Sequence, residues 1–180
     1  MRLVKEQSVC LLIDMQEKLF PHMAERDRLV NRISTLLQGL RLLGTEIIVT
    51  QQYSKGLGET IPQVSSIIHE FSFIEKISFS CCDEPLFAEK IDISEKKFII
   101  IAGIEAHVCV LQTTLDLLER NFVPVVVEDC VSSRDRSDKQ IAIERMRCSG
   151  AIITSCESLL FELTRFAGSE VFKSISRLVK

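Results

Sequence analysis

Asp14, Lys76 and Cys109 are the residues of this 180-residue chain whose types and positions could support a nucleophilic reaction. A thiol reacts as its thiolate, and a thiolate forms near neutral pH only beside a base or a positive charge. A carboxylate, an ammonium group and a thiol that fold together would supply these parts. Each of the three residues also has an ordinary structural interpretation. The strands and helices that carry them help to distinguish a catalytic role from a structural one.

Asp14 comes directly after an apolar run at residues 9–13. A carboxylate at the carboxyl end of a central strand points to the crevice in which doubly wound α/β proteins bind ligands. Asp is also a favoured helix cap and turn former. Position alone therefore leaves both interpretations of Asp14 open.

Cys109 follows a turn of small residues and lies in the segment Ala-Gly-Ile-Glu-Ala-His-Val-Cys-Val at residues 102–110. This pattern predicts that the thiol lies in the first turn of a helix after a strand. Unpaired N–H groups and the helix dipole favour an anion there, so we expect a lowered thiol pKa. The alternative is a buried structural cysteine.

Lys76 is a polar residue in a mostly apolar, extended segment at residues 73–79. Taken by itself it fits best an exposed lysine on an edge strand, which discourages aggregation. Only its combination with Asp14 and Cys109 favours a catalytic role.

Metal and phosphate chemistry lack their motifs in this sequence. The seven cysteines form no C-x-x-C pair, and the three histidines share no ligand spacing. No P-loop, G-x-G-x-x-G or G-x-S-x-G segment occurs. We therefore expect no metal and no cofactor, and we expect the other six cysteines to be reduced and packed as small apolar residues.

The composition fits one soluble globular domain over residues 1–180, with 46% apolar and 26% charged residues and a net charge of −3. Disorder is excluded by the high apolar share. The mild negative charge gives no electrostatic reason for a nucleic-acid partner. Because no apolar run is long enough to cross a membrane and no signal peptide is evident, we expect a cytoplasmic location.

Short apolar runs alternate with helical patterns along most of the chain. The helical patterns include a leucine-rich stretch that ends before Gly44 and another that ends before Gly150. This alternation predicts a three-layer α/β/α fold with a doubly wound, mainly parallel sheet. The predicted strands are residues 9–13, 46–50, 98–102, 123–127 and 151–154.

The segment at residues 51–90 breaks this rhythm with glycines and prolines, and we expect it to cover a pocket. Short helices are predicted near residues 64–68 and 84–90. At the C-terminus, residues 166–180 offer apolar side chains that could pack either on a neighbouring subunit or on the chain's own sheet.

Several motifs, taken in order, resemble the isochorismatase-like, or cysteine hydrolase, superfamily. They are Leu-Ile-Asp-Met-Gln at residues 12–16, Gly-Ile-Glu-Ala-His-Val-Cys-Val at 103–110, Val-Glu-Asp-Cys-Val-Ser-Ser-Arg at 127–134 and Gly-Ala-Ile-Ile-Thr-Ser at 150–155. The likeness runs from the first strand to Leu163 and implies a Rossmann-like six-stranded sheet.

The resemblance implies a role for each reactive residue. Cys109 is the nucleophile, Asp14 the general base and Lys76 the cation that stabilises the thiolate. A cis peptide is implied between Ile104 and Glu105, and the backbone amides of Glu105 and Cys109 are the implied oxyanion hole. The substrate pocket is expected to include Gln16, Phe20, Gln52 and Tyr53.

Differences between this sequence and known members of the superfamily narrow the range of expected substrates. Nicotinamidases hold a metal with an Asp-x-His pair after the second strand, whereas residues 50–53 here read Thr-Gln-Gln-Tyr. Isochorismatases proper cleave an enol ether without the cysteine. The resemblance then implies hydrolysis of an amide or related C–N bond of a small molecule through a thioester. Because members of the superfamily are usually homo-oligomers, it also implies a homo-oligomer.

Two alternatives remain open at this point. The chain could be a non-catalytic oligomeric member of the fold. Its thiol could also serve redox sensing, with Cys81 and Cys82 as resolving partners.

Overall fold

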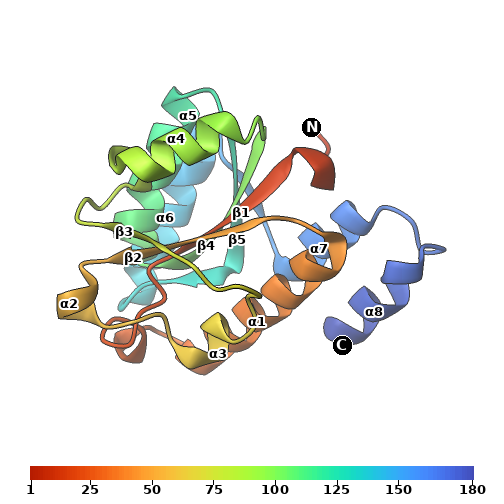
Figure 1. The fold of residues 1–180 in the computed structure, drawn as a ribbon, viewed down its shortest axis with the longest axis horizontal. Coiled ribbons are helices and arrows are strands. Elements are labelled where there is room, and N and C mark those ends of the chain that lie inside the picture. Colours follow the sequence, from red (N-terminus) through yellow and green to blue (C-terminus); the bar gives the residue numbers. More distant parts are fainter.

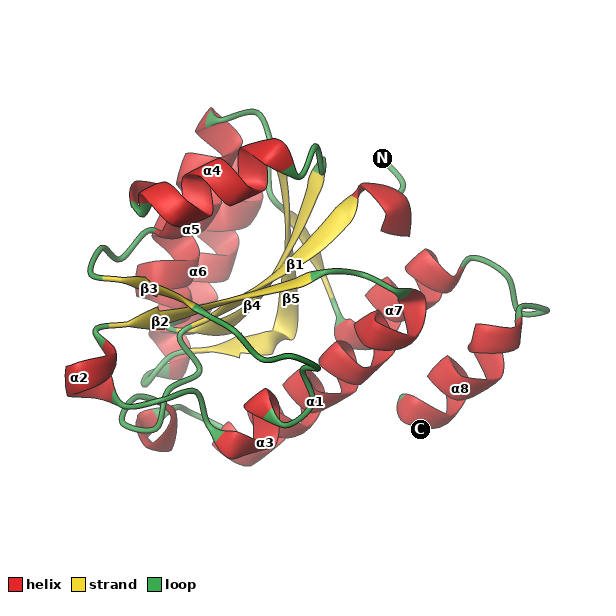
Figure 2. Cartoon of the chain, in the orientation of Figure 1, coloured by secondary structure: helices red, strands yellow, loops and turns green.

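Six parallel strands form the central sheet, in the order β3-β2-β1-β4-β5-β6. The computed structural model describes all residues from 1 to 180. Figures 1 and 2 show the sheet between two layers of helices. The strands are β1 Ser8–Ile13, β2 Ile47–Gln52, β3 Ile74–Lys76, β4 Phe98–Ile104, β5 Val123–Ser132 and β6 Ile152–Thr154.

The helices cover both faces of this sheet, which confirms the predicted three-layer α/β/α fold. α4, α5 and α6 lie on one face, and α1, α3, α7 and α8 lie on the other (Figure 1). The bounds are α1 Arg26–Leu43, α2 Ser54–Leu57, α3 Pro62–Ser65, α4 Pro85–Ile93, α5 Leu111–Glu119, α6 Arg136–Ser149, α7 Cys156–Thr164 and α8 Glu170–Leu178.

The central strands β1 and β4 are apolar on both faces because helices cover both. Every residue of the two strands is buried. Along β1, Cys10 and Leu12 face the layer that contains α1, whereas Leu11 and Ile13 face the layer that contains α4. The carboxyl ends of both strands are therefore buried between the two helix layers.

The leucine-rich helix α1 ends where the sequence predicted. Gly44 has a φ of 72°, and its N–H donates to the carbonyl groups of Arg41 and Leu40. Few residues other than glycine adopt this left-handed conformation without strain. The chain then turns directly into β2.

Two features of the sheet differ from the sequence prediction. The sixth strand that the resemblance implied is β3, the extended segment around Lys76 at the edge of the sheet beside β2, which was not among the strands predicted from the apolar runs. The strand predicted at residues 123–127 continues to Ser132, because a bulge lets β5 pair with β4 again at Gly103 and Ile104. Both differences lengthen the sheet edge at which the reactive residues lie.

The C-terminal segment packs on its own chain. α8 contacts α1 and α7, and Ile175 is buried. These contacts fit the expected packing on the chain itself, although they are made to helices rather than to the sheet. No helix has both the length and the apolar character needed to cross a membrane.

Candidate active site

Four neighbouring strands bring the reactive residues together at their carboxyl ends. Asp14 follows β1, Gln52 ends β2, Lys76 ends β3, and Cys109 lies in the turn after β4. Gln52 and Lys76 are paired in the register of β2 and β3. Because parallel strands end at the same edge of a sheet, positions far apart in the sequence converge here.

Asp14 and Lys76 form a completely buried ion pair. The distance from Lys76 Nζ to Asp14 Oδ2 is 2.7 Å, and both side chains are 0% exposed. The interpretation of Lys76 as an exposed edge lysine is therefore wrong. Burial of two charges is tolerated only when each compensates the other.

Lys76 is surrounded by acceptors on several sides. Besides Asp14, its ammonium group donates to the carbonyls of Ser78 at 3.0 Å and Phe79 at 3.2 Å. Burial lowers the pKa of Lys76, whereas the negative charge of Asp14 raises it, and the pKa is raised overall. Lys76 is therefore a fixed positive charge at neutral pH.

Thr50 orients the carboxylate of Asp14. Its Oγ1 donates to Asp14 Oδ1 over 2.8 Å, which leaves Oδ2 for Lys76. The Cys81 thiol lies 3.9 Å from the same hydroxyl. Thr50 was not among the site residues expected from the sequence. The sequence did contain an indication of this role, because a threonine in an apolar strand next to the strand that precedes Asp14 offers a buried hydroxyl donor.

Cys109 contacts both the cation and an amide. Its Sγ lies 3.7 Å from Lys76 Nζ and 3.1 Å from Gln52 Oε1, and the residue is 5% exposed. The thiol lies in a π-helical turn, Ala106–Val110, that leads into α5. The structure thus places the thiol where the strand-turn-helix pattern predicted.

The expected lowering of the Cys109 pKa is wrong. Burial raises the pKa of this thiol, and the negative charge of Asp14 raises it further, whereas Lys76 lowers it. Desolvation and the carboxylate outweigh the cation and the start of the helix. The resting site therefore holds a neutral thiol beside an ion pair.

The turn before Cys109 has an unusual backbone. The peptide bond between Ile104 and Glu105 is cis. Gly103 has a φ of 119°, and a Cβ atom there would lie 2.1 Å from the carbonyl oxygen of Ile13. Glycine is required at this close approach of β4 to β1.

Glu105 is held at both its backbone and its side chain. Its carbonyl accepts from the N–H groups of Val108 and Val110, and its own N–H donates to no group of the chain. Its carboxylate accepts from the N–H and the Nε of Arg134, at 3.2 and 3.0 Å. A free backbone donor thus lies in the turn that carries the thiol.

Of the four residues expected to line a substrate pocket, only Gln52 contacts the reactive group. The amide of Gln16 is fully buried and bonds to the backbone of Gln52 and Gly58. Tyr53 is 52% exposed, and Phe20 packs against the apolar cluster on the α1 face.

The histidine closest to Cys109 in the sequence bonds to other side chains. His107 contacts Ser133 at 2.9 Å and Asp138 at 3.8 Å. No group of three or more His, Cys, Asp or Glu side chains is arranged to hold a metal ion. All seven cysteines are free, and Cys148 is the exposed one.

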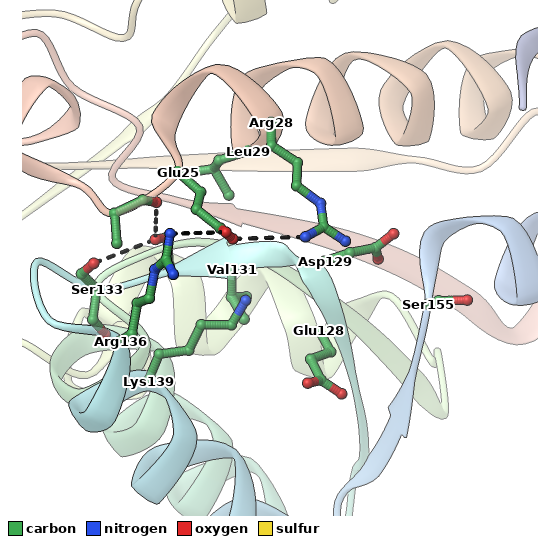
Figure 3. A pocket seen from close by; sticks show the side chains of 12 residues that line it. Glu25, Arg28, Leu29, Glu128, Asp129, Val131, Ser133, Arg136, Lys139 and Ser155 are labelled. Atoms are coloured by element: carbon green, nitrogen blue, oxygen red, sulfur yellow. Dashed lines mark hydrogen bonds and ion pairs between the residues drawn. The ribbon is translucent and has the colours of Figure 1, made fainter.

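A separate, strongly charged cavity of about 250 Å³ lies between the start of α1, the end of β5 and the start of α6 (Figure 3). Glu25 pairs there with Arg28 at 3.7 Å and Arg136 at 3.1 Å. Lys139 reaches into the same cavity, where burial lowers its pKa. None of the residues of the buried ion pair or the thiol lines this cavity.

Comparison with known proteins places the chain in one family. A family model described as the isochorismatase domain matches residues 8–158. Isochorismatase family protein 1B of Dictyostelium discoideum is 40% identical over 183 residues, which cover 99% of this chain and 89% of the relative.

Solved structures agree with this assignment. The MAR1 ribonuclease of Caenorhabditis elegans has a TM-score of 0.94 and 34% identity, covering 99% of this chain and 92% of that chain. The YcaC protein of Escherichia coli, described as an octameric hydrolase of unknown specificity, has a TM-score of 0.92 and 24% identity, covering 98% and 88%. At that identity the likeness to YcaC concerns the fold alone. By sequence and by fold, the chain belongs to the isochorismatase family and has its hydrolase fold.

Proposed function

We propose that this chain is a cysteine-dependent hydrolase that cleaves an amide or related C–N bond of a small molecule. The observation that carries the proposal is the contact of Cys109 Sγ with a buried Asp14–Lys76 ion pair. A nucleophile, a base and a cation in one dry site are the parts that covalent acyl transfer needs. The hydrolase fold of the family supports the same reaction class.

The charge balance of the site explains how a thiol of raised pKa can react. Loss of its proton to water would leave a net negative charge in a buried site. Transfer of the proton from Cys109 to Asp14 instead keeps the sum of the three charges at zero, because the thiolate then pairs with Lys76. Asp14 therefore acts as the base during attack on the substrate.

The acylation step follows from this arrangement. Cys109 Sγ forms a bond to the carbonyl carbon while its proton passes to Asp14, and the developing oxyanion accepts from the N–H groups of Glu105 and Cys109. The free N–H of Glu105 supports this assignment. Asp14 then returns the proton to the leaving nitrogen as the C–N bond breaks.

Deacylation completes the cycle. Asp14 takes a proton from a water molecule that attacks the thioester, and Cys109 leaves with that proton. The products are an amine or ammonia and a carboxylic acid or carbamate. The reaction uses no group beyond the chain, the substrate and water.

A panel of small amides tests the proposal through release of ammonia or amine. Cys109→Ala is expected to abolish a release that the wild type shows, while circular dichroism reports an unchanged fold. Cys148→Ala, which removes an exposed thiol, serves as the matched control and keeps the activity. Equal release by wild type and Cys109→Ala would refute the proposal.

A second candidate function is cleavage of RNA, because the Caenorhabditis elegans relative is described as a ribonuclease. The net charge of −3 gives no electrostatic attraction for a polyanion, which favours the amide substrate. Incubation of the wild type and Cys109→Ala with RNA separates the two. If only the wild type cleaves RNA, the proposed function becomes RNA cleavage by Cys109 rather than amide hydrolysis.

Redox sensing by Cys109 is a weaker candidate. The Cys81 thiol is fully buried and its pKa is raised to about 12 by burial and by Asp14. Such a thiol is a poor resolving partner. A reversible disulfide of Cys109 after mild peroxide treatment, seen by mass spectrometry, would favour sensing over hydrolysis.

The proposed enzyme acts as a homo-oligomer in a reducing compartment such as the cytoplasm. The octameric state of the Escherichia coli relative supports the first point, and seven free cysteines support the second. Light scattering after size-exclusion chromatography tests the assembly, and a mass of one chain would contradict it.

A further inference from the structure

The side-chain oxygen of Gln52 contacts both the thiol and the cation of the proposed site. Gln52 Oε1 lies 3.1 Å from Cys109 Sγ and 3.3 Å from Lys76 Nζ. An ammonium group only donates hydrogen bonds, so the carboxamide has to present its oxygen rather than its nitrogen at this point. That oxygen only accepts, so the Cys109 thiol is the donor in this contact.

The backbone of Gln52 is fixed in place by Gln16. The Gln16 side chain accepts from the Gln52 N–H at 2.8 Å and donates to the Gln52 carbonyl at 3.0 Å. A third bond joins Gln16 to the carbonyl of Gly58 at 2.8 Å. Gln52 can therefore release the thiol only by rotating its side chain.

We propose that Gln52 is a positioning residue that holds the proton on Cys109 in the resting enzyme, so that the nucleophile stays neutral until this contact is broken. The lone pairs of Oε1 face the sulfur and would repel a thiolate, so the contact favours the protonated form. The charged and titratable groups that face Cys109 are Asp14, Lys76 and Cys81.

In the proposed reaction, which this inference extends, a bound substrate displaces Oε1 from the thiol. The S–H bond then breaks as an O–H bond forms on Asp14, and the net charge of the site does not change. Gln52 thereby links activation of the nucleophile to occupation of the site.

Alkylation by iodoacetamide tests the inference without any substrate. The rate is measured at Cys109 by mass spectrometry of peptides, with the exposed Cys148 in the same molecule as the internal reference. Gln52→Met keeps nearly the same side-chain length but removes the carbonyl acceptor. In this variant the ammonium group of Lys76 still contacts Asp14 and the carbonyls of Ser78 and Phe79, so the ion pair is expected to stay in place.

At one neutral pH, iodoacetamide is expected to alkylate Cys109 about two- to tenfold faster in Gln52→Met than in the wild type. This is the effect of one lost neutral hydrogen bond. In Gln52→Glu, whose side chain has the same size and a negative charge, Cys109 is expected to be alkylated more slowly than in the wild type. A residue that merely fills space would give equal rates for the three side chains. Equal or slower alkylation of Gln52→Met would overturn the inference.

Gln51→Met is the matched control. The Gln51 side chain bonds to Thr60 and Ser54 rather than to the thiol, so its loss is expected to leave the Cys109 rate unchanged. Because alkylation needs no amide hydrolysis, failure of the hydrolase proposal would leave this result intact. Conversely, an active hydrolase with an unchanged alkylation rate in Gln52→Met would refute only the role of Gln52.

Discussion

The buried ion pair at the ends of β1 and β3 and the charged cavity beside α6 use the same kinds of side chain in opposite settings. Asp14 and Lys76 lie 2.7 Å apart with no exposure, whereas Arg136 and Glu25 lie 3.1 Å apart with side chains 76% and 43% exposed. Water screens the second pair and is excluded from the first. The distances are similar, so the energetic difference comes from burial.

That difference shows where chemistry can be concentrated. In the exposed cavity each charge can exchange its partner for water at little cost. At the buried site the protonation of one group depends on that of its neighbours, because an uncompensated charge there is not solvated by water. The proposed transfer of the Cys109 proton to Asp14 therefore depends on the burial of this site.

Removal of one buried charge is expected to have the largest effect. Lys76→Met leaves Asp14 as an uncompensated buried carboxylate, and the free energy of unfolding is expected to fall by about 3–5 kcal/mol. Urea denaturation measures the change. The double variant Asp14→Asn, Lys76→Met is expected to recover part of the loss, and no recovery would contradict the assignment of the loss to the unpaired charge.

A smaller loss is expected when the carboxylate keeps its cation but loses its hydroxyl partner. Thr50→Val removes the donor to Asp14 Oδ1. Hydrogen bonds to charged groups contribute about 1.5–3 kcal/mol, so unfolding free energy should fall by that amount. Thr50→Ser restores the hydroxyl and is expected to rescue the stability, whereas equal loss in both variants would point to packing instead.

Buried thiols predict a dependence of stability on pH. Burial raises the pKa of Cys10 and of Cys81 from 9.0 to about 12. Above pH 9 these thiols lose protons in the unfolded state first, so their stabilisation is complete below pH 9 and is lost as the pH rises toward 12. Each contributes a slope of about 1.4 kcal/mol per pH unit in this window.

The slope is measured by urea denaturation at several pH values under reducing conditions. Cys10→Ala is expected to remove one thiol's share of the slope. Cys148→Ala, at an exposed position, is the control that should leave the slope unchanged. An unaltered slope in Cys10→Ala would contradict the prediction.

The smallest effect is expected at the exposed pair. Arg136→Met removes the cation that faces Glu25, and the free energy of unfolding should change by less than about 1 kcal/mol. The same urea assay compares it directly with Lys76→Met. A loss as large as that of Lys76→Met would break the distinction between the two regions.

Local sequence patterns were sufficient for the fold class, whereas the proposed site rested on the resemblance of several motifs to the superfamily. The apolar runs at β1, β2 and β4 and the glycine after α1 were visible because burial on both faces and a left-handed helix end each demand particular residue types. The positions of Asp14 and Cys109 followed from strand ends in the same way. By contrast, β3 holds only three residues, too few for a strand pattern of its own.

The sequence by itself determined that Asp14 and Cys109 follow the ends of buried strands, because strand and helix patterns are short-range properties. The tertiary structure alone decided that Lys76 is buried, that Thr50 bonds to Asp14, that Gln52 contacts the thiol, and that burial raises the pKa of Cys109. Desolvation and charge pairing depend on every group that surrounds an atom, and those groups come from four different strands.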